Sequence, residues 1–166
     1  MKKLFIIFLF TLPFFIGCSS NNNSRAVQNI QVVEKYVQSV ENLDYKTMAS
    51  LLDDHYWGYG PAYGDSINKQ QALKQWKYNV EHLYKSIHYN KSRSVAMTIK
   101  DGVNYGDWVS NWGELHIVFK DGKTVNLWAN TIYKVKNGKI VKSYTFYDEA
   151  DALQQLGYVF VNPADL

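Results

Sequence analysis

Apolar residues near the start of the chain recur every three or four positions, with Gln, Glu and Lys between them. This spacing predicts an amphipathic helix over about residues 26–42, because positions three and four apart share one helix face. The apolar positions that define this face are Val27, Ile30, Val33, Val37 and Val40.

Three shorter helices are also expected. Asp44 can cap a second helix, and Asn68 followed by Gln71 resembles a capping box at the start of a third helix that reaches about Tyr84. A last helix is expected over residues 148–156, where Gly157 ends it.

Alternating and β-branched segments predict strands over residues 55–59, 87–99, 108–119, 125–135 and 140–147. Asp121-Gly122 and Asn137-Gly138 separate the last three strands and are typical of two-residue hairpin turns. Helices followed by a run of antiparallel strands indicate an α+β fold in which helices pack on the sheet.

The two turns also predict how the strands pair. With Asp121-Gly122 as a two-residue turn, Lys120 faces Lys123, and side chains then alternate between the two sheet faces. One face is expected to carry Trp112, Glu114, His116, Thr131, Tyr133, Tyr144 and Asp148. The opposite face is expected to carry Asn111, Trp128, Asn130 and Tyr147. A single bulge would exchange the two sets beyond it.

Three stretches carry a family resemblance. Residues 36–61 read as an opening helix, a turn with Asp44 and a first strand, residues 68–76 as a helix start, and residues 138–157 as a closing strand and helix. Together they resemble the nuclear transport factor 2-like superfamily, in its SnoaL-like branch. The resemblance implies a cone-shaped, strongly curved antiparallel sheet packed on N-terminal helices, with a pocket at the open end.

Ketosteroid isomerases of this fold permit a comparison residue by residue. By resemblance, Tyr36 falls on their oxyanion-binding tyrosine and Thr131 falls on or near their second oxyanion group. Their general-base aspartate stands immediately before a proline, whereas this chain has Gly60 before Pro61. Since glycine cannot accept a proton, the comparison argues against their reaction.

Four residues are candidate catalytic groups: Tyr36, Glu114, His116 and Asp148. A histidine and carboxylates in an apolar cone suit general acid–base catalysis, and the resemblance to SnoaL-like cyclases implies proton transfer. The alternative is that Glu114 and His116 are solvated and Asp148 caps the final helix. Candidate pocket-lining residues are Trp57, Tyr59, Trp76, Trp112, Thr131 and Tyr144, with core packing as the alternative.

The start of the chain has the pattern of an export signal. Lys2 and Lys3 precede an apolar run over residues 4–16, and Gly17 precedes Cys18, the only cysteine. The pattern resembles the lipobox of bacterial lipoproteins. It implies a signal peptide over residues 1–17, a lipidated Cys18, a flexible tether over residues 18–25 and a domain over residues 26–166. The alternative is an ordinary signal peptide or an uncleaved anchor, in which the cysteine occurs by chance.

Charge and histidine spacing narrow the function classes. Without Lys2 and Lys3, 16 basic residues remain against 15 acidic ones and form no stripe, which argues against nucleic acid binding. The four histidines lack paired metal-ligand spacing, and no glycine-rich phosphate loop occurs, so neither a metal nor a cofactor is expected.

Two main hypotheses remain. The first is a membrane-tethered module in the cell envelope, by resemblance at the outer membrane if the cell has one, that binds a small apolar ligand or a protein partner. The alternative is a proton-transfer enzyme of the dehydratase, isomerase or cyclase type. A pure interaction domain with a filled cone is a third reading. A homodimer through the sheet face with Trp128 and Asn130 is also expected.

Overall fold

The computed structural model describes residues 20–165. Its helices are α1 (Ser20–Glu41), α2 (Tyr45–Leu51), α3 (Lys69–Tyr78) and α4 (Glu149–Gln155), with the short helices η1 (Asn79–Leu83) and η2 (Pro163–Asp165). Its strands are β1 (Leu52–Tyr59), β2 (Ser66–Asn68), β3 (Tyr84–Ile99), β4 (Gly106–Phe119), β5 (Thr124–Lys136) and β6 (Lys139–Phe146).

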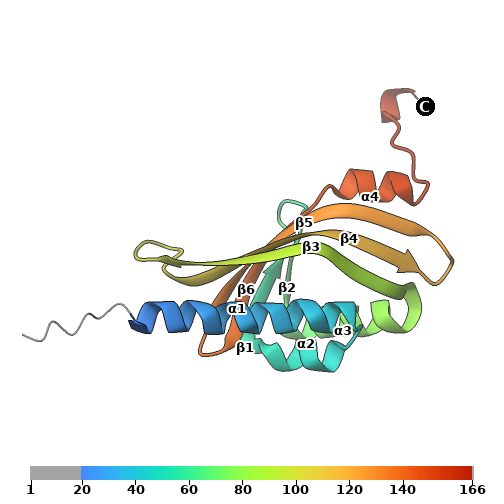
Figure 1. Cartoon of the computed structure of the whole chain (residues 1–166). Helices are drawn as coiled ribbons and strands as arrows, with labels where there is room; N and C mark the ends of the chain where they lie inside the picture. Colours follow the sequence, from blue (N-terminus) through green and yellow to red (C-terminus); the bar gives the residue numbers. More distant parts are fainter. Residues whose placement is uncertain (1–19, 166) are drawn as a thin grey trace, which may run out of the picture.

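The strands form one curved, six-stranded sheet in the order β2-β1-β6-β5-β4-β3. Figure 1 shows α1 running along one side of this sheet, with α2 and α3 near its end, and α4 beside β5. The predicted α+β class with helices packed on a curved sheet is confirmed. The sheet is mixed rather than fully antiparallel, because β1 pairs in parallel with β6.

The main hydrophobic core lies between α1, α2 and the inner face of the sheet, the face toward α1. The apolar stripe of α1 supplies Val33, Val37 and Val40, and α2 supplies Met48 and Leu51, all of them buried. From the sheet, Val109 and Ile140 are fully buried against them. Burial of these side chains holds the helices on the inner face.

Local capping follows the sequence closely. The side chain of Asp44 accepts a hydrogen bond of 3.0 Å from the backbone N–H of Thr47 at the start of α2. Asn68 and Gln71 form the predicted capping box, with both reciprocal hydrogen bonds present. These contacts satisfy N–H groups that a helix start leaves unpaired. The third helix continues from α3 through η1 to Leu83, close to its expected end, and β3 begins at Tyr84.

The predicted register between β4 and β5 is wrong by one residue. The loop has three residues, because Phe119 rather than Lys120 pairs with Lys123, through a hydrogen bond of 2.9 Å from Phe119 N–H to Lys123 O. Gly122 has φ of +88° and closes this loop in the left-handed region. Glu114 therefore faces Trp128, and His116 faces Asn126, across the strand pair.

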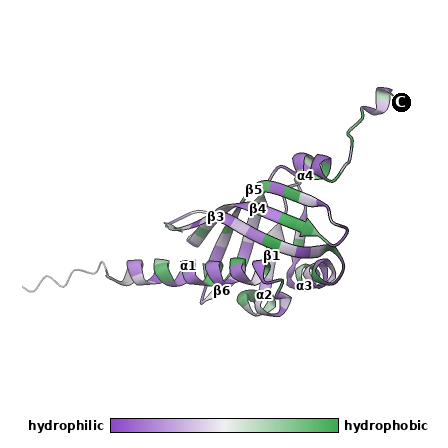
Figure 2. Ribbon diagram, turned by 45° about the vertical axis from the view of Figure 1, so that its right-hand side comes forward, coloured by the Kyte–Doolittle hydropathy of each residue, from purple (hydrophilic) through white to green (hydrophobic). Residues whose placement is uncertain are grey.

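A second shift affects β6. The Asn137-Gly138 turn pairs Lys136 with Lys139 as predicted, but the register changes between Lys134 and Val135. Beyond this irregularity Thr131 pairs with Thr145 rather than with Tyr144. Relative to β5, the first shift exchanges the predicted faces of β4, and the second exchanges those of β6 beyond the irregularity. Figure 2 shows apolar and polar positions alternating along the strands, which fits a sheet with two distinct faces.

The two ends of the described chain lie outside this core. Cys18 and the predicted signal peptide lie outside the described residues, and α1 already begins at Ser20, within the stretch expected as a tether. Within residues 20–165, no helix combines the length and apolar character needed to cross a membrane. After α4, the chain extends away from the sheet in both views (Figures 1 and 2).

Candidate functional site

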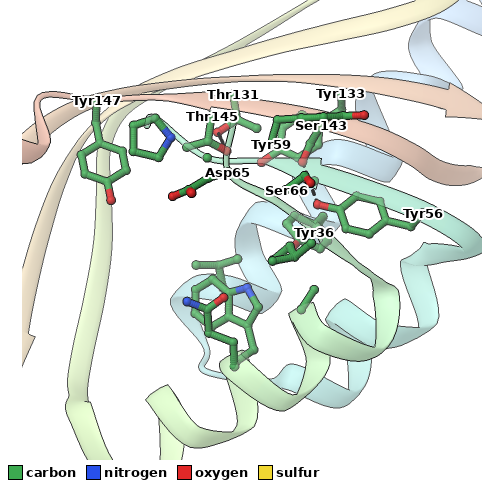
Figure 3. Close-up of a pocket in the computed structure, with 18 of the residues that line it drawn as sticks. Tyr36, Tyr56, Tyr59, Asp65, Ser66, Thr131, Tyr133, Ser143, Thr145 and Tyr147 are labelled. Carbon is green, nitrogen blue, oxygen red and sulfur yellow. Dashed lines mark hydrogen bonds between the residues drawn. The ribbon is translucent and has the colours of Figure 1, made fainter. Parts of the chain in front are cut away.

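A cavity of about 540 Å³ opens between the inner face of the sheet, the segment that joins β1 to β2, and the helices α1 and α3. Its wall combines aromatic rings with many hydroxyl groups (Figure 3). The lining residues are Tyr36, Val40, Tyr56, Gly58, Tyr59, Gly60, Pro61, Asp65, Ser66, Ile67, Ala72, Gln75, Trp76, Tyr89, Thr131, Tyr133, Ser143, Thr145, Tyr147 and Glu149.

Buried tyrosines form the deep part of the wall. Tyr36 on α1 and Tyr133 on β5 meet edge to face, with ring centroids 5.7 Å apart. Burial raises the pKa of both phenols well above the ordinary value, and burial likewise raises the pKa of Tyr56 and Tyr89. These hydroxyls therefore stay protonated near neutral pH, where each can donate a hydrogen bond.

Several wall hydroxyls already pair with one another. The Tyr56 and Ser143 hydroxyl groups share a hydrogen bond of 2.7 Å, and the Thr131 hydroxyl donates to that of Thr145 at 3.2 Å. Gly58 makes room for the first pair, since a Cβ atom there would lie 2.4 Å from the Tyr56 hydroxyl oxygen. These contacts fix part of the wall in place.

Asp65 brings a carboxylate to the mouth of the cavity. The segment between β1 and β2 closes through hydrogen bonds from Gly60 N–H to Asp65 O and from Asp65 N–H to Ala62 O, at 3.3 and 3.2 Å. A Cβ atom at Gly60 would lie 3.5 Å from the Asp65 Cβ and 3.9 Å from its Oδ2. Asp65 thus occupies the space beside position 60, and Figure 3 shows it near Thr145 on the same side as Tyr147.

The structure brings four of the sequence-predicted residues to this cavity: Tyr36, Tyr59, Trp76 and Thr131. Although Tyr59 is among the lining residues, it pairs with Tyr144 and its ring stacks on that of Tyr144, with centroids 4.8 Å apart, so the Tyr59 ring lies on the outer face. Tyr144 itself belongs with Ile132 to the opposite, outer face of the sheet, so the prediction that it faces the cavity is wrong.

The register shift moves the other expected groups to the outer face as well. Glu114 forms an ion pair with Lys91, with Oε2 and Nζ 3.0 Å apart, and the Nδ1 of His116 lies 2.7 Å from the Asn126 Oδ1. The expectation that Glu114 and His116 face the pocket is wrong, because they pair with Trp128 and Asn126 rather than with the pocket-facing neighbours.

Trp112 and Trp57 lie on that outer face too. Trp112 pairs with Asn130, and Trp57 pairs with Lys142; their exposed fractions are 40 % and 45 %. The residues predicted for the opposite face are also divided between the two faces. Trp128 and Asn130 lie on the outer face. Asn111 pairs with the cavity residue Thr131, and Tyr147 lines the cavity.

Asp148 serves as a helix cap. Its side chain accepts a hydrogen bond of 3.0 Å from the backbone N–H of Asp151 at the start of α4. It is absent from the cavity wall, whereas its neighbours Tyr147 and Glu149 contribute to that wall. The observed geometry therefore agrees with the alternative that Asp148 caps the final helix.

Sequence reasoning missed Tyr56, Asp65, Ser143, Thr145 and Glu149. The correct register would have identified Ser143 and Thr145, because they pair with Tyr133 and Thr131. Asp65 has no such periodic signal, since it lies in an irregular segment. Within residues 20–165, no group of three or more His, Cys, Asp or Glu side chains is arranged to hold a metal ion.

Comparison with known proteins supports the fold. No family model and no curated protein matches the chain. A solved structure of a proposed polyketide cyclase from Xanthomonas campestris matches with a TM-score of 0.66 and 13% identity, over 80% of this chain and 98% of that one. A nuclear transport factor 2-like protein from Burkholderia xenovorans matches with a TM-score of 0.61 and 14% identity, over 78% of this chain and 96% of that one.

An LEH-like epoxide hydrolase from M. tuberculosis also matches, with a TM-score of 0.58 and 15% identity, over 80% of this chain and 91% of that one. The chain therefore has the nuclear transport factor 2-like fold that its sequence resembles.

The buried tyrosines predict a two-stage alkaline titration. Tyr36 and Tyr133 have folded pKa values above the unfolded value of about 10, so folding favours their protonated forms. This stabilisation is complete below pH 10 and is lost as the pH rises toward the folded pKa values. Absorbance near 295 nm should show exposed tyrosines ionising first and the buried ones only as the protein unfolds.

Tyr36→Phe should remove amplitude from the late stage only, whereas replacement of the fully exposed Tyr63 by Phe should remove it from the early stage. Simultaneous ionisation of all 13 tyrosines near pH 10 would contradict the burial of this cluster.

Proposed function

We propose that this chain binds a small organic molecule in the tyrosine-lined cavity, while a lipidated Cys18 holds it at the cell envelope. The open cavity carries this proposal. Its volume of about 540 Å³ falls in the range of small-molecule sites, roughly 300–1,000 Å³. Its wall is aromatic with convergent hydroxyl groups, which suits a ligand with an apolar body and a few polar groups.

Neighbouring residues on β6 provide a matched test of ligand binding. Thr145 lines the cavity, whereas Phe146 pairs with Asn130 on the outer face and is 52 % exposed. Thr145→Trp should fill part of the cavity and weaken binding at least about tenfold, equivalent to roughly 1.4 kcal/mol. Phe146→Trp should leave affinity unchanged.

The measurement is a thermal-shift screen of small organic compounds, followed by calorimetry on those that stabilise the protein. Compounds that stabilise the unmodified protein and the Phe146→Trp variant but not the Thr145→Trp variant would support the cavity as the site. Equal binding to both variants would place the site elsewhere and contradict the proposal.

The anchor has its own test. Cys18→Ser removes the thiol that lipidation requires, so the protein should leave the membrane fraction and lose incorporation of a labelled fatty acid. Two or more acyl chains give stable membrane attachment, whereas one chain gives marginal binding. Replacement of the neighbouring Ser19 by Ala is the control and should leave labelling intact. Unchanged labelling of Cys18→Ser would exclude Cys18 as the modified residue.

A second candidate is proton-transfer catalysis, favoured by the position of Asp65. Its carboxylate lies beside Gly60, the position at which the isomerases of this fold carry their base. Tyr36 lines the same cavity and keeps its proton, so it can donate a hydrogen bond to a developing oxyanion. A carboxylate and a phenol facing one bound carbonyl compound can move a proton from the adjacent carbon.

Asp65→Asn tests this reaction directly. If Asp65 is the base, the variant should slow deuterium exchange at carbon adjacent to a carbonyl by about 100-fold or more, measured by NMR on a panel of small ketones. Asp54→Asn is the control, because Asp54 is an exposed acid on β1 that pairs with Lys69. Equal exchange rates for the protein and Asp65→Asn would eliminate Asp65 as the base.

We also propose that the outer face of the sheet mediates a homodimer. It carries exposed apolar side chains of the kinds enriched in interfaces. These residues are Trp57, Val95, Met97, Trp112, Trp128 and Phe146. The oligomeric state of the protein in solution tests this proposal.

A further inference from the structure

The charges around the cavity are all of one sign. Its lining residues include two carboxylates, Asp65 and Glu149, and no Lys, Arg or His. Tyr36 and Tyr133 add no charge near neutral pH, because a phenol ionises only near pH 10 and burial raises the pKa of both further. A negatively charged ligand would meet two like charges here and no counter-charge, which disfavours its binding.

The two carboxylates are exposed, and within the described residues they have no partner. Within residues 20–165, neither the Asp65 nor the Glu149 side chain forms an ion pair or accepts a hydrogen bond. Acidic groups that do form ion pairs lie away from the cavity wall: Asp54 with Lys69, Glu114 with Lys91, and Asp107 with Arg25. The cavity thus presents two carboxylates whose counter-charge the described chain does not supply.

Aromatic rings line the same cavity as these carboxylates. Tyr147 immediately precedes Asp148 and Glu149 in the chain and lies on the same side of the cavity as Asp65 (Figure 3). Tyr36 and Trp76 contribute to the wall from α1 and α3. The negative face of an aromatic ring attracts a cation, and it attracts one more strongly where water is excluded.

The hydroxyl groups make a neutral polyol a weaker match. Tyr56 and Ser143 already satisfy each other at 2.7 Å, and Thr131 and Thr145 do so at 3.2 Å. A polyol would have to compete with these pairs, whereas a cation could approach the free carboxylates without breaking them. The arrangement therefore favours charge recognition over recognition of many hydroxyl groups.

We propose that the cavity selects a small organic cation, whose substituted ammonium group lies between the carboxylates of Asp65 and Glu149 and the aromatic side chains of Tyr36, Trp76 and Tyr147. This inference rests on the proposed binding function and specifies its ligand class. Its carboxylates come from separate elements, the β1–β2 segment and α4, so both must be in place for full selectivity.

Three compounds of nearly the same shape test the inference on the mature protein. Choline carries a trimethylammonium group, 3,3-dimethylbutan-1-ol has a neutral carbon in place of its nitrogen, and 3,3-dimethylbutanoate carries a negative charge. Calorimetry should show choline binding at least about tenfold tighter than the neutral alcohol, and the anion not binding. Added salt should weaken choline binding and leave binding of the alcohol nearly unchanged.

The double variant Asp65→Asn and Glu149→Gln should abolish this preference while retaining the binding of the neutral alcohol. Glu114→Gln is the matched control, since Glu114 lies on the outer face paired with Lys91, and it should keep the preference. Circular dichroism and thermal melting establish that the variants are folded.

Equal affinity for choline and the alcohol, or a preference that survives the double variant, would overturn the inference and leave the binding function standing. Failure of choline to bind would also overturn it. In that case, a neutral or anionic compound that binds the protein but not Thr145→Trp would show that the cavity still binds ligands. If the screen finds no compound whose binding is lost in Thr145→Trp, that result would contradict both the inference and the proposed function.

Discussion

Strand register is the constraint on which the rest of this structure depends. Side chains alternate between faces along a strand, so a shift of one residue decides whether a group faces the cavity or the outer surface. Here the three-residue loop closed by Gly122 directs Glu114 and His116 outward. The irregularity near Val135 then directs Ser143 and Thr145 inward.

The sequence predicts the elements better than the site for this reason. Apolar periodicity identifies α1, and the capping residues Asp44 and Asn68 identify the starts of α2 and α3, because these signals are local. Hairpin turns were located correctly, but Asp121-Gly122 is compatible with a two-residue turn and with the last two positions of a three-residue loop. The distinction depends on how the whole sheet curves, which short-range patterns do not encode.

The residues that were predicted correctly for the cavity do not depend on that register. Tyr36 and Trp76 lie on helices whose apolar faces are fixed by their own periodicity, and the family resemblance located Thr131 near the pocket. Asp65 had no signal of either kind. It follows Gly64, which has φ of +91°, in an irregular segment whose path is set by its own hydrogen bonds and by Gly60.

The wall and the charges of the cavity have different structural origins, and this separation bears on function. Sheet and helices supply the volume and the tyrosine hydroxyls, and they are held by core burial and by pairs such as Tyr56 with Ser143. The carboxylates come from a connecting segment and from the first turn of α4, where sequence can change without disturbing the core. Neighbours with 13–15% identity can therefore share the shape of the cone while their sites differ in chemistry. In this chain, Asp65 and Glu149 supply the charges of the cavity lining, and the fold itself does not require them.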